Sequence, residues 1–194
     1  MTRMIAFLIF SLSVTHALAA APTTAPTTAP ATAPSNPLAT QRSRDGDFEV
    51  QAPENWKSWQ GGLDIYDIYL CGPARAFLFC NSDAKEDFAH PEDALNVVAD
   101  QKIESSREWI HASAAAEPQS IRIGEYPAVR CEVRGESYGR ITIHVLTIME
   151  MPTRIVAWVG VSYPSKIEQH RQQFEQIVAT TRDVPPTPPA PDGK

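Results

Sequence analysis

The pentapeptide Gly135-Glu-Ser-Tyr-Gly139 has the spacing of a nucleophile elbow, in which a serine is exposed at a sharp strand-to-helix turn. Such a serine needs a histidine base and an acid, and His170 with Glu150 or Glu168 lies downstream. A second strand follows the pentapeptide, however, and its glycines also suit a β-hairpin loop, which needs positive φ angles. The pattern therefore predicts a hairpin at Ser137, with a serine hydrolase as the less favoured alternative.

Three carboxylates and an imidazole occur close together at Asp83, Glu86, Asp87 and His90. Oxygen and imidazole ligands of this kind can hold calcium, manganese or zinc. Their spacing matches no recognised metal loop, and acidic residues before a helix are also explained by the helix dipole and capping. We favour this second explanation; if a metal binds, Asp83, Asp87 and His90 are the predicted ligands.

The cysteines Cys71, Cys80 and Cys131 could form a disulfide in an oxidising compartment. Cys71 and Cys80 fall at opposite ends of one predicted strand, some 25 Å or more apart at about 3.3 Å per residue, which is too far for a bond. We therefore expect Cys131 to pair with Cys71 or Cys80. No Cys-x-x-Cys, phosphate-binding loop or His-Glu-x-x-His sequence occurs.

Aromatic side chains concentrate binding energy where they line a groove. Trp158 lies within a long apolar run and is expected in the core. The other tryptophans together with one tyrosine are the candidates for a ligand or partner surface, namely Trp56, Trp59, Tyr66 and Trp109. Core or core-edge placement is the default expectation for the tryptophans.

The histidines are scattered, and none is predicted to be catalytic. His144 shares one face of its predicted strand with Thr142 and Leu146, so we expect it to be partly buried with its hydrogen bonds satisfied. His111 and His170 fall on predicted helices and are expected at the surface.

Hydrophobic periodicity predicts strands and helices in a regular order. The stretch 154–163 is apolar at nearly every position, which is typical of a central strand covered on both faces. A helix beginning at Pro91 has apolar residues at three- and four-residue spacing, and another begins at Ser165, which would form a capping box with Glu168. The predicted strands are 48–52, 63–70, 76–80, 121–133, 140–149 and 154–163, and the helices are 91–111 and 165–180. This order, βββ-α-βββ-α, predicts an α+β fold with a single antiparallel sheet of about six strands and helices packed on it.

Several features of this order resemble PsbP-like domains: Phe48-Glu-Val-Gln-Ala-Pro followed by Trp56, the entry Ile123-Gly124 with Pro127-Ala128-Val129, and the closing Tyr163-Pro164 with a helix. That family includes the extrinsic photosystem II subunit, secreted bacterial relatives and a distant Ran-binding Mog branch. The resemblance covers residues 48–181 and consists of order and pattern without an invariant motif. It implies an antiparallel sheet covered by helices and a non-catalytic binding or assembly-accessory role, and it transfers no site residue.

The two ends of the chain have compositions unlike that of a folded domain. Residues 1–19 look like a secretory signal, with an apolar run of about 11 residues that is too short to span a bilayer, and cleavage after Ala19 or Ala21. Residues 20–43, rich in Ala, Pro and Thr, are predicted to be a disordered linker, and 185–194 a disordered tail. Residues 44–184 would then form one domain of ordinary size.

Cleavage after Ala19 would remove only Arg3 from the charged residues, leaving 16 Lys and Arg against 23 Asp and Glu, a net charge of −7. Such a chain disfavours nucleic acid as a partner. We expect export to the periplasm or the extracellular space, no integral membrane span, no cofactor, and binding to another envelope or extracellular protein. The alternative is a carrier of a small ligand, a lipid or a glycan, with a pocket lined by Trp56, Trp59 or Tyr66 between sheet and helix. The sequence predicts no oligomeric state.

Overall fold

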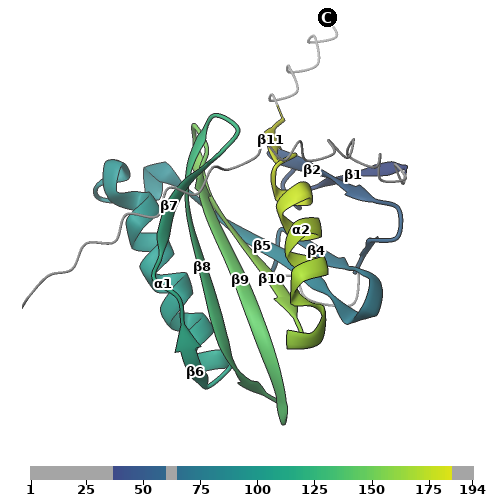
Figure 1. Cartoon of the computed structure of the whole chain (residues 1–194). Helices are drawn as coiled ribbons and strands as arrows, with labels where there is room; N and C mark the ends of the chain where they lie inside the picture. Colours follow the sequence, from purple (N-terminus) through teal and green to yellow (C-terminus); the bar gives the residue numbers. More distant parts are fainter. Residues whose placement is uncertain (1–36, 60–64, 185–194) are drawn as a thin grey trace, which may run out of the picture. The chain divides into compact units, whose positions relative to one another are not determined.

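A large antiparallel sheet runs through the part of the chain that the computed structural model describes, residues 37–59 and 65–184 (Figure 1). Its strand order is β3-β4-β5-β10-β9-β8-β6, and β7 also pairs with β8. Every described strand pair is antiparallel, as predicted. The strands are β3 (Lys57–Ser58), β4 (Ile68–Cys71), β5 (Phe77–Ala84), β6 (Ala112–Ala115), β7 (Gln119–Ile123), β8 (Tyr126–Ser137), β9 (Arg140–Glu150) and β10 (Arg154–Ser162).

A second, three-stranded sheet consists of β1 (Leu38–Arg42), β2 (Phe48–Pro53) and β11 (Arg182–Asp183). The α+β class is therefore confirmed, but the described strands form two sheets and number more than six. The predicted linker extends too far, because residues 38–42 pair with β2 as an ordered strand. The predicted signal, the linker up to residue 36 and the tail lie outside the described residues.

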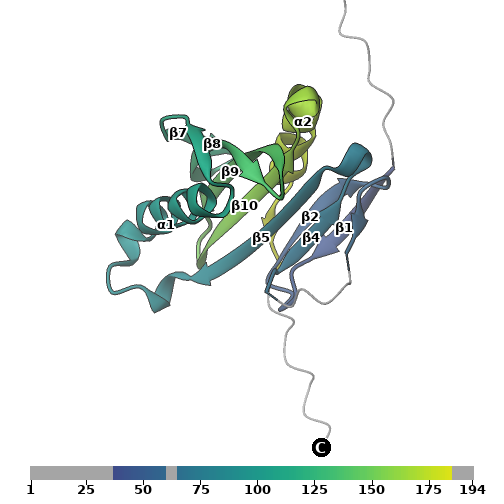
Figure 2. The same cartoon turned by 90° about the horizontal axis from the view of Figure 1, so that it is seen from below.

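The helix α1 (Ala94–Trp109) covers one face of the large sheet (Figure 2). It follows a 3₁₀ turn, Pro91–Asp93, which agrees with the predicted start at Pro91. Its buried residues pack against β8, β9 and β10, and they are Ala94, Val98, Ala99, Ile103 and Ser106. The helix ends just before His111, whose φ of 43° leaves the helical region.

The helix α2 (Ile167–Val178) and the three-stranded sheet cover the opposite face. Here the rings of Phe48 and Trp158 pack edge to face with centroids 6.5 Å apart. Residues 142–149 of β9 are buried without interruption because the large sheet has a core on each face. The capping box predicted from Ser165 and Glu168 is wrong, since α2 has no side-chain cap and follows a 3₁₀ turn, Pro164–Lys166.

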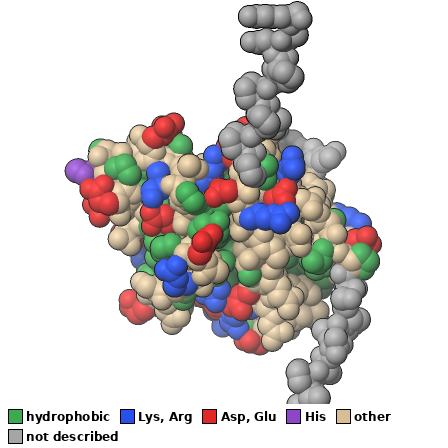
Figure 3. All heavy atoms as spheres, turned by 90° about the horizontal axis from the view of Figure 1, so that it is seen from above, with side chains coloured by type: hydrophobic (Ala, Val, Ile, Leu, Met, Phe, Trp, Pro, Cys, Tyr) green, Lys and Arg blue, Asp and Glu red, His purple; other side chains and the backbone are tan. Residues whose placement is uncertain are grey.

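The surface carries charges of both signs side by side. On the face shown in Figure 3, acidic and basic side chains of the described residues alternate, and no large area of that face has a single sign. No described helix is long and apolar enough to serve as a membrane span.

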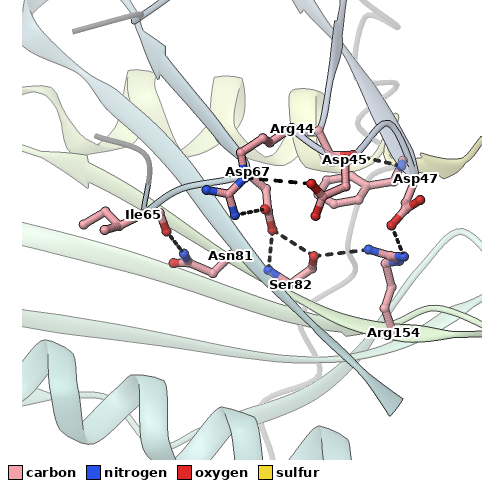
Figure 4. A network of polar contacts seen from close by, with 10 residues as sticks. Arg44, Asp45, Asp47, Ile65, Asp67, Asn81, Ser82 and Arg154 are labelled. Carbon is pink, nitrogen blue, oxygen red and sulfur yellow. Dashed lines mark hydrogen bonds and ion pairs between the residues drawn. The ribbon is translucent and has the colours of Figure 1, made fainter. Parts of the chain in front are cut away.

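A polar network joins the loop between β1 and β2 to the large sheet (Figure 4). The Asp67 Oδ2 atom accepts hydrogen bonds from the Ser82 amide at 2.6 Å and the Ser82 hydroxyl at 2.8 Å. Arg154 donates to the same hydroxyl at 3.3 Å and pairs with Asp47, while the Arg44 guanidinium lies 3.6 Å from Asp67. Since both carboxylates face a guanidinium, this cluster fastens the two sheets together and is not available as a ligand site.

Candidate ligand-binding site

The helix α1 covers only part of its face of the large sheet. It packs on β8, β9 and β10, whereas β5 and β4 lie further along the strand order, beyond β10. The face of β4 and β5 that continues the α1 side carries Tyr69, Phe77 and Phe79; Tyr69 pairs with Phe79 across the two strands, and its ring lies 6.1 Å from that of Phe77. Within ranges 37–59 and 65–184, this part of the sheet is therefore an aromatic surface with no helix over it.

These rings form one continuous cluster. Tyr69 and Phe79 are stacked, with centroids 5.6 Å apart and an angle of 6° between their planes, and Tyr66 lies 4.4 Å from Phe79. Phe79 lies 6.2 Å from Trp109, the last residue of α1. Trp109 in turn meets the His144 ring of β9 edge to face at 5.1 Å. The cluster thus connects β4 and β5 to the end of α1 and to β9.

A pocket of about 430 Å³ opens over this cluster. Its size falls within the usual range for small-molecule sites, roughly 300–1,000 Å³. Aromatic rings supply most of its wall, from Tyr69, Phe77, Phe79, Trp109, Tyr138 and Tyr163. Val161 and four polar residues, Ser137, Arg140, Thr142 and His144, complete the lining.

Two buried polar atoms in this lining have no hydrogen-bond partner within the described chain, Thr142 Oγ1 and His144 Nδ1. Both residues belong to β9 and are spaced by two, so they lie on the same face of the strand. Buried polar groups are normally paired because each unpaired one costs about 1–3 kcal/mol. Two such atoms beside one pocket are what a site prepared for a ligand would present.

Burial also fixes the charge state of the site. It lowers the pKa of His144, whose exposed fraction is only 2%, from 6.5 to about 4. The imidazole is therefore neutral at pH 7 and can donate a hydrogen bond from one nitrogen and accept at the other. Arg140 is then the one formally charged residue in the lining, and it makes no ion pair within the described residues.

The rim of the pocket is a tight β-hairpin turn between β8 and β9. Ser137 pairs with Arg140, and the two turn residues Tyr138 and Gly139 have φ angles of 51° and 71°. Positive φ at both positions defines a type I′ turn, which favours asparagine or glycine at the position that Tyr138 occupies. The Tyr138 side chain is 95% exposed. The turn therefore holds an exposed aromatic ring at the pocket in a backbone conformation that tyrosine rarely adopts.

The aromatic residues predicted from sequence divide between this surface and the core. Trp109 lines the pocket and is 48% exposed. Tyr66 contacts the cluster without lining the pocket, and Trp59, 54% exposed, lies 6.5 Å from the Tyr69 ring. Trp56 does not belong to this surface, since it is buried in the core against Phe174 on the opposite side of the sheet, with 5.8 Å between ring centroids. None of the residues Trp56, Trp59 and Tyr66 is among the described residues that line the aromatic pocket.

The arrangement that a serine hydrolase would need is not present in the described chain. Ser137 ends β8 at the hairpin, as predicted, and forms no hydrogen bond with a histidine there. His170, predicted at the surface, is fully buried, and its Nδ1 lies 2.7 Å from the Ser162 hydroxyl. That serine is buried too, so this Ser–His pair has no access to a substrate.

The residues considered as metal ligands do not come together in the described chain. Asp83 lies in β5, and Asp87 ends a separate 3₁₀ turn, Lys85–Asp87. No group of three or more possible ligand residues comes together anywhere in ranges 37–59 and 65–184, so His90 does not join these carboxylates in a metal site.

All three cysteines are free. Cys80 belongs to the core under α2 and Cys131 to the core under α1, so they lie on opposite faces of the sheet. β10 and β9 also separate the strands that carry them, and Cys71 lies one strand further away in β4. The pairing of Cys131 with Cys71 or Cys80 is therefore not formed.

Sequence comparison gives no relative: no family model matches this chain, and no curated protein does. Solved structures do match. LpqN of Mycobacterium tuberculosis, described as involved in cell envelope biogenesis, is 8% identical with a TM-score of 0.57, over 77% of this chain and 91% of LpqN. CyanoP, the cyanobacterial PsbP of Synechocystis sp. PCC 6803, is 9% identical with a TM-score of 0.52, over 82% and 100%.

The Ran-binding protein Mog1p of Saccharomyces cerevisiae is 8% identical with a TM-score of 0.50, over 76% of this chain and 96% of Mog1p. A Bacteroides thetaiotaomicron protein is 12% identical with a TM-score of 0.55, over 76% of this chain, which spans about half of that protein's length, 48%. The chain therefore has the PsbP/Mog-like fold that the sequence pattern suggested. At these identities the comparisons establish the fold and no more.

Proposed function

We propose that this protein is an exported, non-enzymatic binding domain that uses the aromatic pocket as its recognition site. The observation that carries this proposal is the coincidence, in one place, of an uncovered aromatic sheet surface with two buried polar atoms that lack partners. Pockets of this composition, apolar walls with a few polar groups that fix orientation, are typical of binding sites.

The exposed aromatic rim also supports a binding role. Trp109 and Tyr138 both line the pocket while large parts of their side chains face solvent. Exposed rings of this size at a concave site are the type of residue that dominates binding energy in recognition surfaces. Val97 in α1 is also an exposed large apolar residue, but it does not line the pocket.

The chemistry of the lining favours binding over catalysis. His144 has a pKa of about 4 because it is buried, which makes it a weak base at neutral pH. No carboxylate that could orient this imidazole or act as an acid is found among the lining residues that the structure describes. Ser137 is the one serine in the lining, and it lacks the hydrogen-bonded histidine that would activate it.

The composition of residues 1–19, which resembles a secretory signal, supports the proposal of export. LpqN, a protein of the same fold, is involved in cell envelope biogenesis, which is in keeping with such a location. We propose that the domain acts in the periplasm or outside the cell, where its pocket recognises a small ligand or a small group of a larger envelope partner.

Binding of Nile red, a neutral apolar dye, and of decanol to the purified full chain tests the proposal. We expect saturable binding that Trp109→Ala weakens at least about fivefold, as for an exposed aromatic that contributes about 1 kcal/mol or more. The control is Val97→Ala, which removes exposed apolar surface from the same helix outside the pocket. A chain that binds neither probe, or a Trp109→Ala variant that binds as well as the Val97→Ala variant, would contradict the proposal.

A further inference from the structure

We propose that the pocket is specific for a small amphiphile with an apolar body and a single carboxylate head, with Arg140 as the residue that selects the head group. This inference rests on the proposed function, since it assumes that the aromatic pocket is a binding site. It adds the charge and shape of the ligand.

The first argument is the charge of the side chains that line the pocket. Among the described lining residues, Arg140 is the one formally charged side chain, and none is an aspartate or glutamate. The chain as a whole is acidic, with a formal net charge of −6, so a lone unpaired guanidinium beside a pocket stands out from its surroundings. No described carboxylate pairs with Arg140, whereas Arg130, Arg154, Arg171 and Arg182 have such partners. Arg75, Arg122 and Arg134 also lack a described carboxylate partner, but Arg140 alone among these unpaired arginines lines the pocket.

The geometry of an arginine side chain carries the second step. Its planar guanidinium presents two parallel N–H groups that match the two oxygens of a carboxylate. The ammonium group of a lysine has no such paired donors. Arg140 follows the Tyr138-Gly139 turn directly, at the rim and not at the floor. A ligand held there would keep its charged end near water and place its apolar body against Phe77, Phe79 and Trp109.

The third argument comes from the floor of the pocket, which we define as the buried lining residues Thr142 and His144. Below the rim, the lining offers the neutral His144 imidazole and the Thr142 hydroxyl, each with one buried atom that lacks a partner. A neutral imidazole adds no charge, so the floor suits an uncharged polar group such as a hydroxyl or carbonyl on the ligand body. A second anionic group would find no cation there.

The backbone of the rim points the same way. Tyr138 occupies a positive-φ position that asparagine or glycine adopts at less cost, and its ring lines the pocket. A tyrosine in this conformation brings an aromatic ring and a hydroxyl to the mouth of the pocket, next to Arg140. The rim thereby offers an aromatic ring and a cation side by side, where the apolar body of an amphiphile would join its charged head group.

Three probes of equal chain length test the inference: decanoate, decanol and decylamine, with affinities measured by calorimetry on the full chain. We expect decanoate to bind roughly fivefold more tightly than decanol, the scale of a partly exposed ion pair, and decylamine to bind most weakly. Arg140→Gln should make decanoate and decanol equal. The matched control is Arg134→Gln, which removes an exposed arginine from β8, outside the pocket lining, and should keep the preference.

The outcomes separate this inference from the proposed function. Equal binding of decanoate and decanol by the wild-type chain, a preference for decylamine, or a preference for decanoate that survives Arg140→Gln would overturn the carboxylate assignment while leaving a pocket that binds apolar molecules. Absence of binding by all three probes would overturn the proposed function itself, and the assignment with it.

Discussion

The indole of Trp109 and the imidazole of His144 lie edge to face, with ring centroids 5.1 Å apart, where α1 stops covering the large sheet. Trp109 is the last residue of the helix, and the strands beyond it carry the open aromatic surface. The pocket therefore lies at the end of α1, where Trp109 lines it together with the buried residues Thr142 and His144.

Substitution of the hairpin residue Tyr138 should increase the stability of the protein and weaken ligand binding. Tyr138→Asn places a residue that tolerates positive φ in the type I′ turn, so we expect the free energy of unfolding to rise by about 0.5–1 kcal/mol. The same change removes a ring from the pocket and should weaken decanol binding. Urea unfolding and calorimetry on one preparation measure both effects. A variant that loses stability would show that the backbone at this position is not strained.

The pH dependence of stability should carry a contribution from His144. Its folded-state pKa of about 4 lies below the unfolded value, so between these two pKa values the unfolded chain binds a proton that the folded chain does not. Stability therefore falls as the pH falls through this window, by roughly 2 kcal/mol between pH 7 and pH 5. Urea unfolding at the two pH values should show a smaller loss for His144→Gln than for the wild type.

The control for this titration is Val97→Ala, because Val97 is exposed, does not line the pocket and has no ionisable group. The loss of stability of this variant between pH 7 and pH 5 should match that of the wild type. An unchanged pH dependence in His144→Gln would mean that the imidazole is not buried in the uncharged form that the pocket requires.

The glycine at position 135 should be one of the least replaceable residues near the site. A Cβ atom there would lie 2.1 Å from the carbonyl oxygen of Ile110, a backbone atom that cannot rotate away. We expect Gly135→Ala to lower the free energy of unfolding by about 3 kcal/mol and to weaken probe binding, because β8 would move away from the end of α1. Gly124→Ala, which is strained by its φ of 59° but has open space, should cost about 1 kcal/mol in the same urea titration.

The elements of the fold could be predicted because their signals are local. The apolar stretch 154–163 became the central strand β10, and the stripe of α1 was visible in its spacing. The second sheet could not be seen, because β1 is a short polar segment that is ordered only by pairing with β2, and β11 has two residues. Pairing of this kind depends on tertiary contacts that no local pattern records.

The site was only partly predictable, and for a similar reason. Trp109 lines the pocket, whereas Trp56 lies in the core, the default expected for a tryptophan, at a place that depends on Gly72, which lacks a side chain and lets the indole approach. The polar floor was missed because His144 was expected to have satisfied hydrogen bonds. Phe77 and Phe79 alternate on β5, and this spacing could have indicated an aromatic face of the sheet. How much of that face α1 covers could not be predicted from a local pattern.

The error over His170 leads to a last prediction. Position 170 continues the apolar spacing of Ile167, Phe174 and Ile177, so helix geometry places it inside although its residue type suggests the surface. Its Nδ1 atom has one described partner, the Ser162 hydroxyl at 2.7 Å, and its Nε2 atom is buried without one. Ser162→Ala should therefore cost about 1–3 kcal/mol in urea unfolding, the penalty for leaving a buried polar group unpaired.

The double variant Ser162→Ala with His170→Phe separates this penalty from a simple loss of packing. Replacing both partners by apolar groups removes the unpaired atoms, so the double variant should be more stable than Ser162→Ala alone. Ser165→Ala provides the matched control, since that serine is exposed and caps no helix, and it should stay within about 0.5 kcal/mol of the wild type. If Ser162→Ala proved as harmless as Ser165→Ala, the buried hydrogen bond would contribute nothing, and the position of His170 would be determined by packing against Phe174 alone.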